Sequence, residues 1–145
     1  MMGKSWVIPL FFGLLAAMLG GCRHAPDETL VRQGIEAAAN AAEHANASAL
    51  ADVLSGDFDG NAGSADRRQL VGLLRAAAFR GDSIHALVGP VSVEARGERY
   101  VASFTVTLTS GGKLLPAQMG VYKVETAWRK EGHEWHCYSA TWTSD

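Results

Sequence analysis

The chain has 145 residues, of which 48% are hydrophobic and 19% charged, and this length and composition predict one globular domain. Its 13 basic and 15 acidic side chains leave a net charge of −2, which argues against a nucleic-acid-binding protein, because such proteins usually carry a basic excess. The hydrophobic content excludes a disordered chain, and two cysteines are too few for a disulfide-stapled scaffold.

The first 21 residues have the pattern of a secretory signal peptide. Lys4 carries the only charge before the uncharged run 6–21, which is shorter than the roughly 20 residues of a membrane-spanning helix. The run ends in Leu19-Gly20-Gly21-Cys22, which resembles the bacterial lipobox. This resemblance implies cleavage before Cys22 and acylation of that residue. The alternatives are an ordinary secretory signal and an uncleaved anchor.

The residues after Cys22 suggest where the protein is held. Arg23 rather than Asp follows the cysteine, and the resemblance then implies the outer membrane, with the domain facing the periplasm. We expect residues 22–27 to form the lipidated cysteine and a short tether, and residues 28–145 to form the domain. Such a short tether keeps the domain close to the bilayer. With Cys22 acylated, Cys137 has no partner in the chain and is expected to be a buried structural thiol.

Three helices are predicted after the tether. The Ala-rich residues 28–45 have apolar positions at helical spacing, and a short second helix is expected after a cap at Asn46 or Ser48. A polar loop is predicted over residues 55–65. Asp66 then caps a third helix that ends near Gly81. The apolar stripe of this third helix consists of Leu70, Leu73, Leu74, Ala77 and Ala78.

From Ser83 the sequence alternates between apolar and polar residues, as strands do. We expect a strand that begins near His85 and ends at Ala95, followed by strands over residues 100–108, 122–128 and 135–142. A hairpin turn at residues 131–133 joins the last two. Three helices followed by a curved antiparallel sheet of about four strands is an α+β arrangement.

This order of elements resembles the nuclear transport factor 2-like superfamily, a cone-shaped α+β fold. The resemblance is carried by the Ala-rich first helix with Ile35, the segments 49–55 and 57–58, and the last hairpin from Tyr122 to Trp135. It implies that the helices cover the concave face of the sheet and leave a blind pocket, and that the convex face is available for a homodimer. The superfamily includes isomerases and dehydratases, but a fold does not fix an activity.

The alternation in the strands predicts which side chains line the pocket. Inward positions are Tyr100, Ala102, Phe104, Val106, Tyr122, Val124 and Trp128. In the last strand we place Trp135, Cys137 and Ser139 toward the pocket, and His136, Tyr138 and Trp142 on the convex face. The candidate pocket residues are therefore Tyr100, Phe104, Tyr122, Trp128 and Trp135. No carboxylate lies among the inward positions, and proton-transfer catalysis would need one there, unless a β-bulge reverses the alternation.

Two functions fit these observations. The first is a non-catalytic lipoprotein that binds a small apolar ligand or an envelope partner. The second is an isomerase-, dehydratase- or hydrolase-like enzyme that uses Asp57 or His85, both weak catalytic candidates, at the mouth of the pocket. We expect no metal site, because no two histidines have ligand spacing on a shared face. We expect no cofactor, because the sequence holds no phosphate- or dinucleotide-binding motif.

Overall fold

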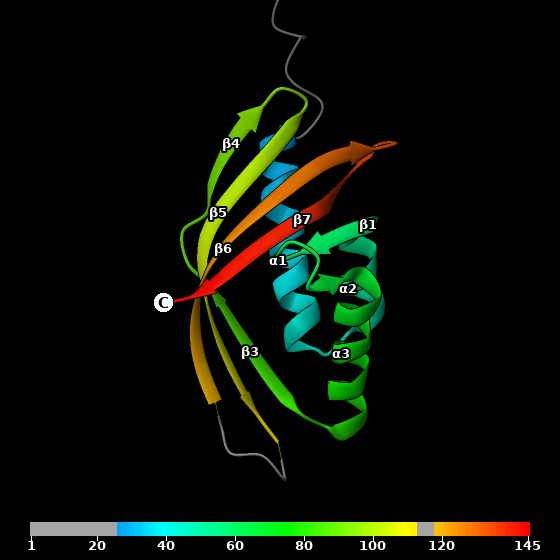
Figure 1. Ribbon diagram of the computed structural model, residues 1–145, viewed down its shortest axis with the longest axis vertical. Coiled ribbons are helices and arrows are strands. Elements are labelled where there is room, and N and C mark those ends of the chain that lie inside the picture. Colours follow the sequence, from blue (N-terminus) through cyan, green and yellow to red (C-terminus); the bar gives the residue numbers. More distant parts are fainter. Residues whose placement is uncertain (1–25, 113–117) are drawn as a thin grey trace, which may run out of the picture.

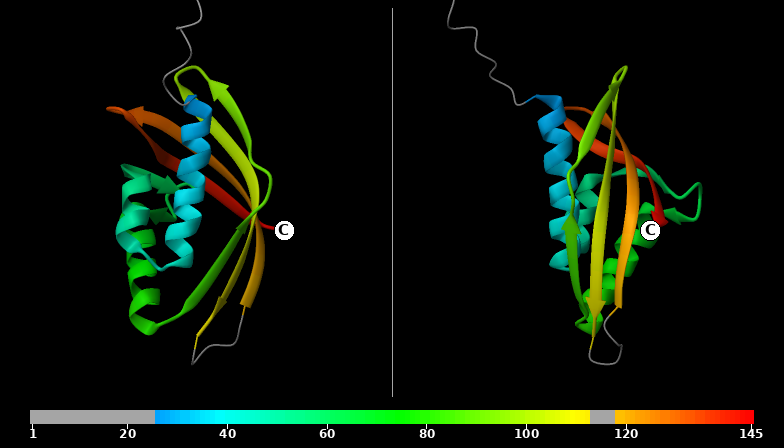
Figure 2. Two further views of the ribbon diagram at one scale, coloured as in Figure 1. Left: turned by 180° about the vertical axis from the view of Figure 1, so that it is seen from behind. Right: turned by 90° about the vertical axis from the view of Figure 1, so that its left-hand side faces the viewer.

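The computed structural model of the protein describes residues 26–112 and 118–145. Its elements are α1 (Asp27–Glu43), α2 (Ala47–Val53), β1 (Leu54–Gly60), β2 (Ala65–Asp66), α3 (Arg67–Arg80), β3 (Ser83–Val88), β4 (Ser92–Arg96), β5 (Arg99–Gly111), β6 (Gln118–Glu131) and β7 (Glu134–Ser144). The helices lie on one side of a bent sheet (Figures 1 and 2). None of the helices in the described ranges is long and apolar enough to cross a membrane. The expected signal peptide and Cys22 lie outside the described residues.

The helix boundaries follow the local capping signals that the sequence predicts. The side chain of Asn46 accepts a hydrogen bond from the Ala49 N–H at 3.0 Å, and Asp66 forms a reciprocal capping box with Gln69. Gly81 ends α3 with a left-handed φ of 72°, which favours glycine. The helix boundaries at Asn46, Asp66 and Gly81 are therefore confirmed.

The predicted apolar stripe of α3 is only partly correct. Leu74 and Ala77 are buried, but Leu73 is 67% exposed and Ala78 is also exposed. Val71 takes a buried position instead. The reason is that α3 packs on α2 and on the strands β1 and β2, so that it buries a narrower face than the spacing of its apolar residues suggests.

The sheet has seven strands, not about four. Their order is β2-β1-β7-β6-β5-β3, and β4 pairs with β5 beside β3. The expected strand from His85 to Ala95 is two strands, because it breaks at Gly89 and Pro90, where proline has no N–H for the ladder. As a result β3 pairs with the C-terminal half of β5 and β4 with its N-terminal half.

The strand β1 occupies most of the segment where a polar loop is expected. It runs parallel to β7, with Leu54 opposite Cys137 and Gly60 opposite Ala140. Directly after β1, the Asn61 side chain accepts a hydrogen bond from the Trp142 N–H at 2.7 Å and donates one to the Trp142 carbonyl at 3.3 Å. The sheet is therefore mixed, and two strands precede the third helix.

A β-bulge in β7 changes which side chains face the helices. Trp128 pairs with Cys137 and the neighbouring Ala127 pairs with Ser139, so that Tyr138 is an extra residue. Beyond this bulge Ser139 shares its row with Ala127, on the opposite face from Trp128, and Trp142 lies on the side of the helices. The placements of Ser139 and Trp142 from simple alternation are thus wrong, whereas the burial of Cys137 is confirmed.

The core lies where α1 crosses the middle of the sheet. Trp128 is only 1% exposed and packs with Val31 and Ala102. Its indole N–H donates a hydrogen bond to the Thr126 hydroxyl at 2.8 Å, which in turn donates to the Ala102 carbonyl at 3.2 Å. The buried polar atoms at this point are therefore satisfied within the protein.

Candidate functional site

An apolar cavity of about 300 Å³ lies between α1 and the concave face of the sheet. Ala38, Ala39 and Ala42 form its wall on the helix, and their small side chains leave space above the sheet. Phe104 and Val124, among others, form the opposite wall. Because nearly every lining group is apolar, the cavity suits a molecule that water solvates poorly.

The few polar atoms in the cavity wall are already engaged. The Thr126 hydroxyl is bonded to Trp128 and to Ala102, as described above. The Cys137 thiol contacts the Ser139 carbonyl at 3.3 Å, and burial raises the pKa of this thiol to about 12. Among the lining residues that the structure describes, Cys137 is the only titratable one. The cavity therefore has no described group that could exchange a proton near neutral pH.

The cavity continues into a groove that reaches the surface between α3 and the sheet. The groove holds about 350 Å³ and shares Leu70, Leu108 and Trp142 with the cavity. Tyr122 also lines the groove. The shared side chains place the groove directly beside the cavity.

The five candidate pocket residues separate into two groups. Phe104 and Trp128 line the cavity, and Tyr122 lines the groove. Tyr100 and Trp135 instead form an edge-to-face pair, with ring centroids 5.2 Å apart, beside a separate hollow near the start of α1. Alternation along a strand predicts the face of a residue but not its distance from the cavity, and the sheet is long enough to hold both hollows.

The two catalytic candidates lie outside the cavity and its groove. Asp57 is exposed on β1, where it accepts a hydrogen bond from the Ser55 hydroxyl at 2.9 Å and forms an ion pair with Arg129. His85 is exposed on β3, next to Ala86, which faces the cavity. Neither side chain lines the cavity, so the structure does not assemble them into a site with it.

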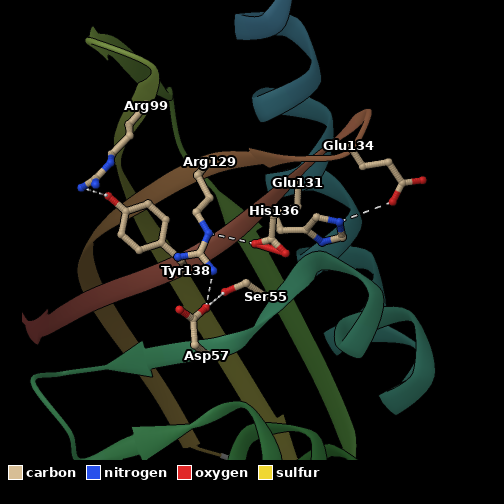
Figure 3. A network of polar contacts seen from close by, with 8 residues as sticks. All are labelled: Ser55, Asp57, Arg99, Arg129, Glu131, Glu134, His136 and Tyr138. Carbon is tan, nitrogen blue, oxygen red and sulfur yellow. Dashed lines mark hydrogen bonds and ion pairs between the residues drawn. The ribbon is translucent and has the colours of Figure 1, made fainter.

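The outer face of the sheet holds a polar network that sequence reasoning missed (Figure 3). Arg129 pairs with Asp57 on one side and with Glu131, at 2.9 Å, on the other. Its guanidinium lies 5.2 Å from the ring centre of Tyr138, and that of Arg99 lies 5.5 Å from the same ring. The network joins β1, β5, β6 and β7, and Tyr138 reaches it from the bulge.

No metal site is found among the residues that the structure describes. In the ranges 26–112 and 118–145, no group of three histidine, cysteine, aspartate or glutamate side chains could hold an ion. His136 lies beside Glu134, with 3.4 Å between Nε2 and Oε2, but no third ligand joins them.

The sequence was compared with protein-family models and with curated proteins. No family model matches it. No curated protein matches it either.

Structural comparison finds many solved proteins of the same shape. A proposed Ca²⁺/calmodulin-dependent kinase II association domain from Exiguobacterium sibiricum has a TM-score of 0.73 at 12% identity, over 86% of this chain and 98% of its own. A proposed dehydratase of the NTF2-like family from Streptomyces avermitilis has a TM-score of 0.68 at 14% identity, over 83% of this chain and 99% of its own. An NTF2-like protein from Cytophaga hutchinsonii has a TM-score of 0.70 at 9% identity, over 83% and 100%. At these identities the likeness concerns the fold alone.

Proposed function

We propose that this chain, whose domain has the nuclear transport factor 2-like fold, is a lipid-anchored bacterial envelope protein that binds a small apolar molecule without transforming it. The observation that carries the proposal is the cavity of about 300 Å³, whose wall is apolar and whose polar atoms are bonded within the protein. A ligand there gains free energy from leaving water, at roughly 0.8 kcal/mol for each buried CH₂ group.

The proposed anchor is Cys22. Its support is the sequence Leu19-Gly20-Gly21-Cys22 after an uncharged run. Attachment of several acyl chains to one residue gives stable membrane binding, whereas one chain is marginal. Arg23 in the following position supports a location in the outer membrane, with the domain in the periplasm.

Binding is favoured over catalysis by the composition of the cavity wall. One protein of this fold is a proposed dehydratase, and an elimination needs a group that takes up or gives a proton near the substrate. Within the described lining of this cavity, Cys137 is the only titratable group, and its raised pKa keeps the thiol neutral. Asp57 and His85 are exposed outside the cavity, so neither is placed to exchange a proton with a molecule bound there.

A fluorescent probe tests the cavity. The chain from Arg23 onward, titrated with the neutral apolar dye N-phenyl-1-naphthylamine, is expected to enhance and blue-shift the emission of the dye. Ala42→Phe places a ring in the cavity and should weaken binding about tenfold or more. Native mass spectrometry of the same preparation would reveal a co-purified ligand.

The matched control is Ala37→Phe, which adds the same ring on the exposed side of α1. It should leave the affinity for the dye unchanged, and circular dichroism should show that both variants are folded. Equal binding by the two variants, or no binding by the unmodified chain, would contradict the proposal.

A further inference from the structure

We infer that the end of the domain that carries Tyr100, Lys130 and Trp135 rests on the phospholipid headgroups of the membrane, and that the groove to the apolar cavity opens away from the membrane. The inference rests on the proposed acylation of Cys22. It adds the orientation of the domain on the membrane and the surface that contacts the lipid. We call this end the anchor-side surface. It surrounds a hollow of about 570 Å³ that is lined by Asp27, Glu98, Arg99, Tyr100, Lys130 and Trp135, among others.

The short tether keeps the start of α1 close to the membrane. Asp27 begins α1 only five residues after Cys22, a stretch that spans about 17 Å when fully extended. The Trp135 indole N–H donates a hydrogen bond to the Asp27 carboxylate at 3.1 Å. The β4–β5 and β6–β7 turns lie at the same end of the molecule as the start of α1 (Figures 1 and 2). The anchor-side surface is therefore the part of the domain nearest to the bilayer.

The side chains of this surface suit a membrane interface. Tryptophan and tyrosine prefer the headgroup level, where an apolar ring meets a polar edge, and Lys and Arg bind lipid phosphates there. Lys130 forms no ion pair within the described residues. Arg99 donates a hydrogen bond to the Tyr138 hydroxyl at 3.3 Å and lies over the ring of that residue. Glu98 adds a negative charge, and the Asp27 carboxylate is bonded to Trp135. Lys130 is thus the cation of this surface that is available to phosphate groups.

The groove lies farther along the long strands, away from the anchor-side surface. Val106 and Leu108, which line the groove, follow Tyr100 by six and eight residues along β5, or about 20 and 26 Å. Leu70 places the groove beside the start of α3. With the anchor-side surface on the membrane, the groove faces the aqueous compartment. The ligand then arrives through water or from a soluble partner, and acyl chains of the bilayer do not enter laterally.

Tryptophan fluorescence tests this orientation with the full chain, expressed with its own signal and reconstituted in phosphatidylcholine–phosphatidylglycerol vesicles that contain brominated lipids. Trp142→Phe keeps Trp135 at the anchor-side surface, and Trp135→Phe keeps Trp142 at the groove. Both variants retain Trp128, which is buried. We expect bromine to quench the emission of the Trp142→Phe variant and to leave that of Trp135→Phe nearly unchanged.

The alternative results each overturn the inference. Stronger quenching in Trp135→Phe means that the groove faces the lipid, and no quenching in either variant means that the domain does not touch the bilayer. Mass spectrometry of the same sample reports acylation of Cys22 separately. If acylation fails, residues 22–145 can be coupled through Cys22 to a maleimide lipid, since Cys137 is only 3% exposed, and the same quenching decides the orientation.

A charge reversal tests the contact with phosphate. For the chain from Arg23 onward, Lys130→Glu should lower the affinity for phosphatidylglycerol vesicles by roughly fivefold or more. The control is Arg75→Glu on the exposed face of α3, which makes the same change in charge far from the anchor-side surface. Equal losses in the two variants would show that only net charge matters and would contradict a specific surface.

Discussion

Arg129 links side chains from three strands on the outer face of the sheet. Its guanidinium binds carboxylates from β1 and from β6 and stacks on the ring of Tyr138 from β7. Each of these contacts is partly exposed to water, so a single ion pair contributes little stability. Together they help to hold β1 in place, because they tie its Asp57 side chain to Arg129 of β6.

The Asp57–Arg129 pair predicts a pH dependence. The hydrogen bond from Arg129, followed by that from Ser55, lowers the pKa of Asp57 below its usual 3.8. Because the folded protein binds this proton less tightly than the unfolded chain, the stabilising effect is present above about pH 4 and is lost as the pH falls through the lowered pKa. Arg129→Gln should therefore move the pKa of Asp57 back toward 3.8.

Carbon-detected NMR titration of the Asp57 carboxyl group would measure this pKa. Arg75→Gln removes a guanidinium from the distant face of α3 and serves as the control. An Asp57 pKa that is the same in the unmodified protein and in Arg129→Gln would show that the ion pair does not persist in solution.

At the scale of the elements, the close approach of α1 to β6 depends on one glycine. A Cβ atom on Gly34 would lie 2.6 Å from the ring of Trp128, which is too close for any real contact. Because Trp128 is only 1% exposed and packs with Val31 and Ala102, its ring has little room to move away from α1. Gly34 thus sets the distance between the helix and the sheet, and with it the position of the cavity wall.

Replacement of this glycine should be costly. We expect Gly34→Ala to lower the free energy of unfolding by about 1–3 kcal/mol, because α1 must move away from the sheet. The control is Gly72→Ala in α3, where a Cβ meets no atom within 4 Å and where alanine should stabilise the helix by roughly 0.5–1 kcal/mol. Urea unfolding of both variants measures the difference, and a stabilising Gly34→Ala would refute this account of the packing.

The elements that could be predicted from the sequence are those specified by neighbouring residues. Asn46 and Asp66 act on their own helices, and the alternation over residues 100–108 reflects one solvated and one covered face. The strand β1 could not be predicted in this way. Its sequence, Leu54-Ser-Gly-Asp-Phe-Asp-Gly, has four residues that disfavour strands, and it is a strand because β7 is there to pair with it.

The candidate site was less predictable than the fold, because it too depends on contacts between residues far apart in the sequence. Phe104 and Trp128 could be assigned to the concave face by alternation, but Trp142 could not, because the bulge at Tyr138 reverses the pattern before it. The partnership of Asp57 and Arg129 depends on the position of β1, and the two residues are 72 positions apart. Long-range pairing and bulges leave no local signal in a single sequence.

At the scale of the whole molecule, the outer face of the sheet carries apolar side chains that nothing in the described structure covers. Leu87 is 72% exposed on β3, and Met119 is 74% exposed on β6. Their strand partners place them in neighbouring rows, with Thr107 and Thr109 of β5 between. Exposed apolar residues gathered on one face favour association, and we expect a homodimer through this face.

Sedimentation equilibrium of the chain from Arg23 onward would test this association. Leu87→Glu should shift the protein from dimer to monomer, because it would bury one unpaired carboxylate from each protomer in the interface. Leu73→Glu, which changes a similarly exposed leucine on α3, should leave the dimer intact. A monomeric unmodified chain at tens of micromolar protein would rule out this interface.

The parallel pairing of β1 with β7 also determines when the chain can fold. Asn61 and Trp142 bind each other's polar groups across 81 positions, so β1 has only the two-residue strand β2 to pair with until β7 has been synthesised. Contacts of such long sequence separation slow folding, because a long loop must close first. This side of the sheet therefore cannot be completed before β7 has been synthesised, and a truncation that removes residues 137–140 would leave β1 paired with β2 alone and with its other edge open.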